Sequence, residues 1–130
     1  MTTSQIRTAN RQLKGLVIAL GIEFILGVIL TTLVSYDSSK HSAVQTGFLV
    51  AHVVVAIGII VGAIIQVVMS IKWRTLRAAA SIGLLGAVGA FGSGEAAVKN
   101  GSNVAVFVMA MCFIVAFICY GYSLLALKRT

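Results

Sequence analysis

Four long runs of apolar residues, separated by short polar segments, dominate this chain. The runs predict helices over residues 15–34, 43–71, 76–94 and 104–127, each near the roughly 20 residues that a helix needs to cross a bilayer core. The segments between them are short, so helices that follow one another in sequence must run antiparallel. The pattern therefore predicts an all-α, four-helix transmembrane bundle with up-down topology, forming a single domain over residues 1–130.

The first 13 residues precede the first apolar run and mix polar with apolar positions. We expect them to form a cytoplasmic amphipathic lead-in or a frayed tail. The apolar run after Lys14 is too long for the core of a cleavable signal peptide, and no small-residue cleavage site follows it. We therefore expect this segment to remain attached to the first membrane-spanning helix.

Composition places the chain among integral membrane proteins. Hydrophobic residues make up 59% of the 130 positions, charged residues only 10%, and the mean hydropathy is +1.05. A soluble domain carries about 25% charged residues. The lipid bilayer is therefore the expected environment, in a cell (plasma) membrane that the chain crosses several times.

The net charge of +7 does not indicate a nucleic-acid partner, because the basic residues flank the apolar runs. Only Lys40 and Lys99 fall in the first and third connections. The others precede the first run, separate the second from the third, or close the chain: Arg7, Arg11, Lys14, Lys72, Arg74, Arg77, Lys128 and Arg129. This asymmetry predicts, by the positive-inside rule, that both termini are cytoplasmic.

Two ionisable residues lie within the apolar runs. Glu23 falls in the run over 16–30, and His52 falls in the second predicted helix. A charged side chain at the bilayer centre costs at least roughly 2.5 kcal/mol on insertion scales, so such residues are commonly paired or functional. Counting inward from opposite faces places both at a similar depth on antiparallel neighbours. We predict a direct or water-bridged contact, either a neutral hydrogen-bonded pair or a pair that handles protons or ions.

The third predicted helix carries a glycine at every third position: Gly83, Gly86, Gly89 and Gly92. Small residues let membrane helices approach closely, which favours a packing role. Gly58 and Gly62 of the second helix form a GxxxG pair that could supply the facing surface. The alternative is a flat cofactor, haem or quinone, lying against the bare backbone at Gly86 and Gly89.

The cofactor alternative also depends on two histidines. His41 precedes His52 by 11 residues, so both face one side if the helix extends back that far, about 16 Å apart. Residues so placed cannot be opposite axial ligands of one iron, so a bis-His haem b would need a second chain. Met109 or Met111 is the other soft ligand available. Both histidines remain candidate cofactor ligands, against a hydrogen-bonded bundle histidine and a solvated loop residue.

No catalytic motif stands out. The sequence contains no CxxC, HExxH, glycine-rich phosphate loop or Ser-His-Asp set, so we expect no enzyme and assign no catalytic residue. Glu95 and His41 are too sparse a combination to predict a metal site. Cys112 and Cys119 lie two helical turns apart, about 10 Å along the axis, which is too far for a disulfide. We expect both to be reduced packing residues.

With these residues placed, the chain resembles a family of small uncharacterised four-span bacterial membrane proteins. The resemblance implies the four-span architecture. A weaker likeness is to one half of haem A synthase and to other four-helix membrane cytochromes, where histidines on two bundle helices hold haem. The residues that carry the main likeness extend over most of the chain: Glu23, Phe24, Leu26, Gly27, His41, His52, Leu85, Gly86, Ala87, Phe91, Gly92, Asn103, Met109, Ala110 and Phe113.

Three classes of function follow from these observations. The favoured one is an accessory or structural subunit, or a small oligomeric membrane protein, in a homo-oligomer or a larger membrane complex. The first alternative is a haem- or quinone-binding protein that uses His52 and the glycines of the third helix. The second is a small proton- or ion-coupled channel or transporter that uses Glu23 and His52.

Overall fold

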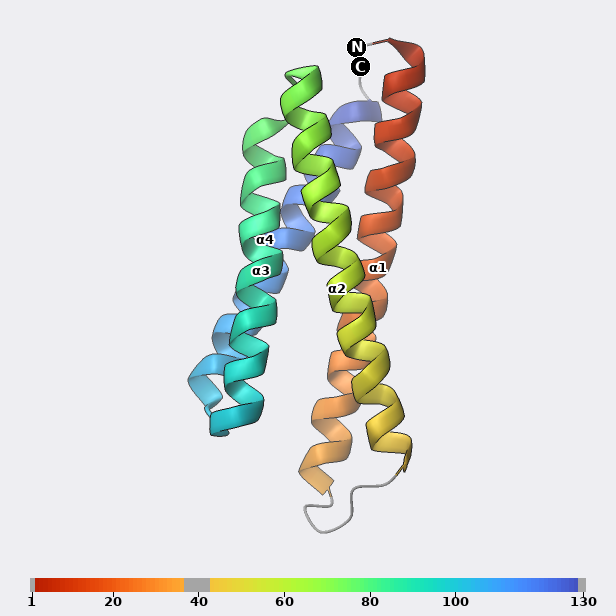
Figure 1. The fold of residues 1–130 in the computed structure, drawn as a ribbon. Coiled ribbons are helices and arrows are strands. Elements are labelled where there is room, and N and C mark those ends of the chain that lie inside the picture. Colours follow the sequence, from red (N-terminus) through yellow and green to blue (C-terminus); the bar gives the residue numbers. More distant parts are fainter. Residues whose placement is uncertain (1, 37–42, 129–130) are drawn as a thin grey trace.

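The structure is a computed structural model that describes residues 2–36 and 43–128. These residues form four helices and no strand (Figure 1). The two chain ends lie at the same end of the bundle, which we call the terminal end (Figure 1). The all-α, up-down four-helix prediction is therefore confirmed. The helices are α1 (Thr3–Tyr36), α2 (Ala43–Trp73), α3 (Arg77–Asn100) and α4 (Asn103–Lys128).

The helices pack as two hairpins, α1 with α2 and α3 with α4. The hairpins meet through α2 with α3 and through α1 with α4, while no contact crosses either diagonal of the described bundle. The α3–α4 contact is the most extensive. Each helix therefore has two neighbours and one side that faces outward.

The buried face of α1 begins well before the first apolar run. Ala9, Leu13, Leu16, Leu20 and Glu23 are all buried, spaced alternately by four and three residues. This is the spacing with which left-handed helical bundles present side chains to one another. Of the two alternatives for the first 13 residues, the frayed tail is wrong, because α1 is continuous from Thr3 and its first turns pack into the core.

The same spacing recurs on α2 and α4. The buried face of α2 comprises Ile59, Ala63, Gln66 and Ser70. On α4 the buried residues are Ala116, Tyr120, Ser123 and Leu127. Each of these buried faces includes at least one polar residue, so the interior of the bundle is only partly apolar.

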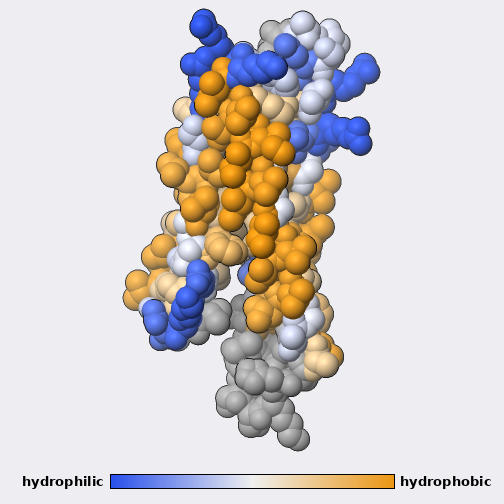
Figure 2. Space-filling view, viewed as in Figure 1, coloured by the Kyte–Doolittle hydropathy of each residue, from blue (hydrophilic) through white to orange (hydrophobic). Residues whose placement is uncertain are grey.

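The core occupies only the half of the bundle next to the terminal end. Among the residues whose burial is described, which leaves out 31–36 and 45, burial stops at Glu23 on α1, starts at Ile59 on α2 and starts at Ala116 on α4. Away from the terminal end the two hairpins part, and the space-filling view shows a gap between them (Figure 2). We call this the outer gap.

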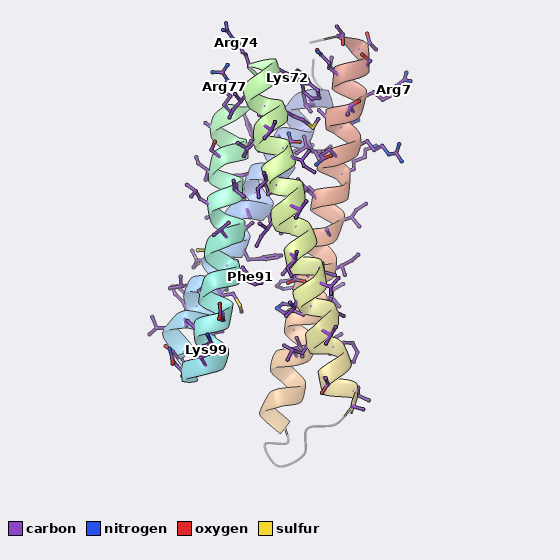
Figure 3. The ribbon with its side chains drawn as sticks, viewed as in Figure 1. Arg7, Lys72, Arg74, Arg77, Phe91 and Lys99 are labelled. Carbon is purple, nitrogen blue, oxygen red and sulfur yellow. The ribbon has the colours of Figure 1, made fainter. Side chains whose placement is uncertain are left out.

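Of the four helices in the described residues, three are long and apolar enough to cross a membrane, namely α1, α2 and α4. The sequence prediction counted four such helices, but α3 does not reach this level, because it is rich in glycine, alanine and serine and ends with Glu95 and Lys99. Large apolar side chains cover much of the outer surface (Figure 2). Basic side chains gather at the terminal end and Lys99 lies at the other, as Figure 3 shows for Arg7, Lys72, Arg74 and Arg77.

Helix α3 continues six residues beyond its predicted end at residue 94. Lys99 Nζ donates a hydrogen bond to Glu95 Oε1 over 2.6 Å, an i,i+4 pair that supports the last turn. Gly101 ends the helix with a positive φ of 60°, and its N–H donates to the carbonyl of Ala97. A left-handed residue at this position is a common helix stop that glycine adopts without steric cost.

Candidate functional site

Glu23 and His52 are in contact across the α1–α2 interface. His52 Nδ1 lies 3.1 Å from Glu23 Oε1, with side chains 27% and 9% exposed respectively. The contact has ion-pair distance, but Nδ1 makes no well-directed hydrogen bond, and Glu23 Oε2 is buried without a partner among the described residues. The predicted contact between these two residues is confirmed, and its hydrogen-bonding capacity is only partly used.

The helix spacing explains why the two side chains meet. Glu23 follows Leu16 by one heptad on the buried face of α1, and His52 precedes Ile59 by one heptad on the buried face of α2. Both side chains therefore point toward the bundle interior. Gly27, one turn beyond Glu23, leaves room for the imidazole, since a Cβ there would lie 3.7 Å from His52 Cε1.

The pair lies where close packing of the bundle ends. At the same level Phe24 of α1 stacks obliquely on Phe113 of α4, with ring centroids 5.9 Å apart and planes at 32°. Phe91 of α3 lies beside the outer gap (Figure 3). Glu23 and His52 thus lie at the level where the buried core ends and the two hairpins part, which we call the floor of the gap, and aromatic side chains lie close to this level.

This arrangement has a definite chemical capacity. The carboxylate retains an unpartnered oxygen, which can accept a hydrogen bond from water, from another protein chain or from a protonated group. Imidazole and carboxylate in contact can share or exchange a proton. Among the described residues, no group of three or more His, Cys, Asp or Glu side chains lies close enough to hold a metal ion.

A second buried polar layer lies nearer the terminal end, and sequence reasoning did not assign it a place. Gln66, Ser70, Tyr120 and Ser123 are all buried. Ser123 Oγ donates to the carbonyl of Cys119 over 2.8 Å, whereas Gln66 Oε1 and Tyr120 Oη have no hydrogen-bond partner among the described residues. The heptad spacing along α2 and α4 was the signal that would have placed them inside.

Three of the four glycines in the α3 stripe face α4, and the fourth, Gly92, does not. A Cβ on Gly83 would lie 2.7 Å from Tyr120 Cζ, and one on Gly86 would lie 2.8 Å from the carbonyl oxygen of Cys112. A Cβ on Gly89 would lie 3.0 Å from Cys112 Sγ. This supports the packing interpretation, since a flat cofactor at Gly86 and Gly89 would have to displace α4.

The prediction that Gly58 and Gly62 of α2 supply the surface facing these glycines is wrong. A Cβ on Gly62 of α2 would approach Leu16 of α1 at 2.9 Å, and one on Gly58 would meet nothing within 4 Å. The GxxxG pair therefore lies on the α1 side of α2. A local motif does not specify which neighbour it meets.

Three further sets of candidate residues came from the sequence: His41, Glu95 and the two cysteines. His41 lies outside the described residues. Glu95 pairs with Lys99, whose hydrogen bond and positive charge hold the pKa of the Glu95 carboxyl below its ordinary value. Cys112 and Cys119 are free thiols, and Cys112 packs against Gly89.

Comparison with protein-family models, with curated proteins and with solved structures found no match to this chain. The likeness to haem A synthase therefore gains no support. What the sequence and the fold together establish is a small helical protein with the apolar helices of a membrane protein.

Proposed function

We propose that the protein is a four-span membrane protein of the plasma membrane, in which the less apolar α3 crosses beside its neighbours α2 and α4, and that both termini are cytoplasmic. We further propose that it serves as a subunit of a homo-oligomer or of a larger membrane complex. The observation that carries this proposal is that the buried core occupies only the half of the bundle next to the terminal end. Along the part of α1 whose burial is described, residues 3–30, buried residues extend from the terminal end to Glu23 and no farther. The other half of the bundle presents an open gap (Figure 2).

The pair on the floor of the gap strengthens the case for a protein partner. Glu23 Oε2 is buried and lacks a hydrogen-bond partner among the described residues. Lipid tails cannot supply a donor, and an unsatisfied buried acceptor costs about 1–3 kcal/mol. A polar or basic side chain from another chain would satisfy this oxygen while its apolar neighbours fill the aromatic gap.

The mass of the assembly tests this proposal. The protein would be extracted directly from membranes into lipid nanodiscs, and the protein mass measured by light scattering. We expect a mass above that of one 13.6 kDa chain. A photo-crosslinking residue at Phe91 should then join two chains, whereas the same residue at Ile18, which is 63% exposed on α1, should not. A single chain in every disc would overturn the proposal.

A second candidate function is proton or ion handling, and the 3.1 Å contact between Glu23 and His52 favours it. A carboxylate and an imidazole at membrane depth are the groups that pumps and transporters use as relays. Proton flux into liposomes that contain the purified protein would test it. This function requires a flux that Glu23→Gln abolishes and Glu95→Gln leaves unchanged. Equal flux in empty liposomes would exclude it.

A further inference from the structure

A groove runs between α1 and α2 on the terminal half of the molecule, with a volume of about 390 Å³. Its floor is open at two points, because a Cβ added to Gly15 or Gly58 would meet no atom within 4 Å. Its polar end is formed by Thr8, Arg11 and Gln12 of α1, and the rest is lined by Gly15, Leu16, Ala19, Gly58 and Gly62. The groove is therefore amphiphilic along its length.

The polar end of the groove carries an uncompensated positive charge. The acidic residues that the structure describes are Glu23 and Glu95, and they pair with His52 and Lys99. Arg11 makes no ion pair with any described residue. Gln12 is held in place because its Nε2 donates to the carbonyl oxygen of Gly62 over 3.2 Å.

We propose that this groove binds an anionic phospholipid. The phosphate lies at Arg11, whose planar guanidinium offers paired donors to phosphate oxygens. One acyl chain lies along the open floor past Gly15 and Gly58. The proposal rests on membrane insertion, which is part of the proposed function, and it does not depend on the oligomeric state or on the chemistry of the Glu23–His52 pair.

Charge complementarity decides the occupant. The described part of the terminal end carries basic side chains on every helix and no carboxylate, and juxtamembrane basic residues attract anionic lipids. A zwitterionic lipid would gain no net attraction there. A helix of a second copy would bring its own Arg11 and neighbouring basic residues toward the same charge, which disfavours it.

Lipid titration with matched variants tests the proposal. Phosphatidylglycerol and phosphatidylcholine would be titrated into the detergent-solubilised protein, and bound lipid counted by native mass spectrometry. The wild type should bind phosphatidylglycerol more tightly. Loss of one basic residue near a lipid surface lowers affinity about fivefold through general attraction alone. The loss of phosphatidylglycerol affinity in Arg11→Gln should exceed about fivefold. The loss in Arg74→Gln, at the same end but outside the groove, should not exceed it (Figure 3).

Substitutions that fill the groove give a second, independent test of lipid binding. Gly58→Leu and Gly15→Leu should both displace the lipid, whereas Gly21→Leu, which also meets no atom but lies outside the groove, should not. Circular dichroism would select the variants that keep the fold. Equal affinity for the two lipids, or equal losses for Arg11→Gln and Arg74→Gln, would overturn the proposal. A change of oligomeric state on filling would assign the groove to a second copy and also overturn it. Release of the wild type from membranes by carbonate would instead overturn the proposed membrane function.

Discussion

Glu23 on α1 and His52 on α2 are 3.1 Å apart, at the level where the two hairpins of the bundle separate. The contact joins polar groups at a depth where the surrounding positions are apolar. Glu23 is the last buried residue in the part of α1 whose burial is described, up to Leu30, so the pair marks the boundary between the closed and the open halves of the molecule.

The α3–α4 contact should tolerate no side chain at Gly86. A Cβ there would lie 2.8 Å from the Cys112 carbonyl oxygen and 3.0 Å from the Ala116 nitrogen, and backbone atoms cannot move aside cheaply. We expect Gly86→Ala to lower the free energy of unfolding in detergent by about 1–3 kcal/mol. Gly92→Ala is the matched control, since its Cβ meets nothing and alanine is the better helix former. Equal stability of the two variants would refute the packing.

The first turns of α1 should contribute to stability. Leu13 is fully buried although it precedes the first apolar run. Leu13→Ala should cost about 2–5 kcal/mol of unfolding free energy, the range for large-to-small changes in a core. Ile18→Ala, on the 63% exposed side of the same helix, should change it by less than about 0.5 kcal/mol. If the two variants unfold alike, the segment is not part of the core.

Orientation can be measured by cysteine labelling in intact cells, after Cys112 and Cys119 are replaced by alanine. Because basic residues gather at the terminal end, we expect that end to face the cytoplasm (Figure 3). Asn100→Cys, at the opposite end, should react with a membrane-impermeant reagent. Ser4→Cys should react only after the cells are opened. The reverse pattern would show that the protein is inserted the other way.

The exposed pair at the end of α3 should be sensitive to acid. The hydrogen bond and charge of Lys99 hold the pKa of Glu95 below its ordinary value. A carboxyl whose pKa is lowered in the folded state stabilises that state above the ordinary carboxyl range and ceases to do so as the pH falls through the lowered value. An NMR titration should therefore give a higher midpoint for Glu95 in Lys99→Gln than in the wild type. Lys72→Gln should leave that midpoint unchanged, and an unchanged midpoint in Lys99→Gln would exclude the pair.

Much of the fold was predictable from the sequence because apolar run length determines the number of helices and short connections determine their direction. The same reasoning placed Glu23 and His52 at one depth. The early start of α1 was missed, because Lys14 separates Ala9 and Leu13 from the first apolar run. Their place on the buried face becomes clear only when the spacing of Leu16 and Leu20 is extended toward the N-terminus.

Other features depend on tertiary packing that no local pattern specifies. Gly86 and Gly89 of α3 meet α4 at Cys112, and the GxxxG motif of α2 takes no part in this contact. The outer gap follows from the way the two hairpins diverge, which residue spacing does not reveal. The sequence therefore located the polar pair without showing that it lies at the floor of an opening.

The most direct test of the Glu23–His52 relationship is a double-mutant cycle on the free energy of unfolding. Glu23→Met and His52→Leu each remove one polar partner at roughly constant size and leave the other in an apolar setting, which should cost about 1–3 kcal/mol. Replacing both partners by apolar groups can be nearly neutral, so the double variant should be clearly more stable than the sum of the single changes predicts. As a control, His52→Leu and Glu95→Gln should add, because the two sites share no contact. Additivity of Glu23→Met and His52→Leu to within about 0.5 kcal/mol would contradict the pairing of these residues at the floor of the gap.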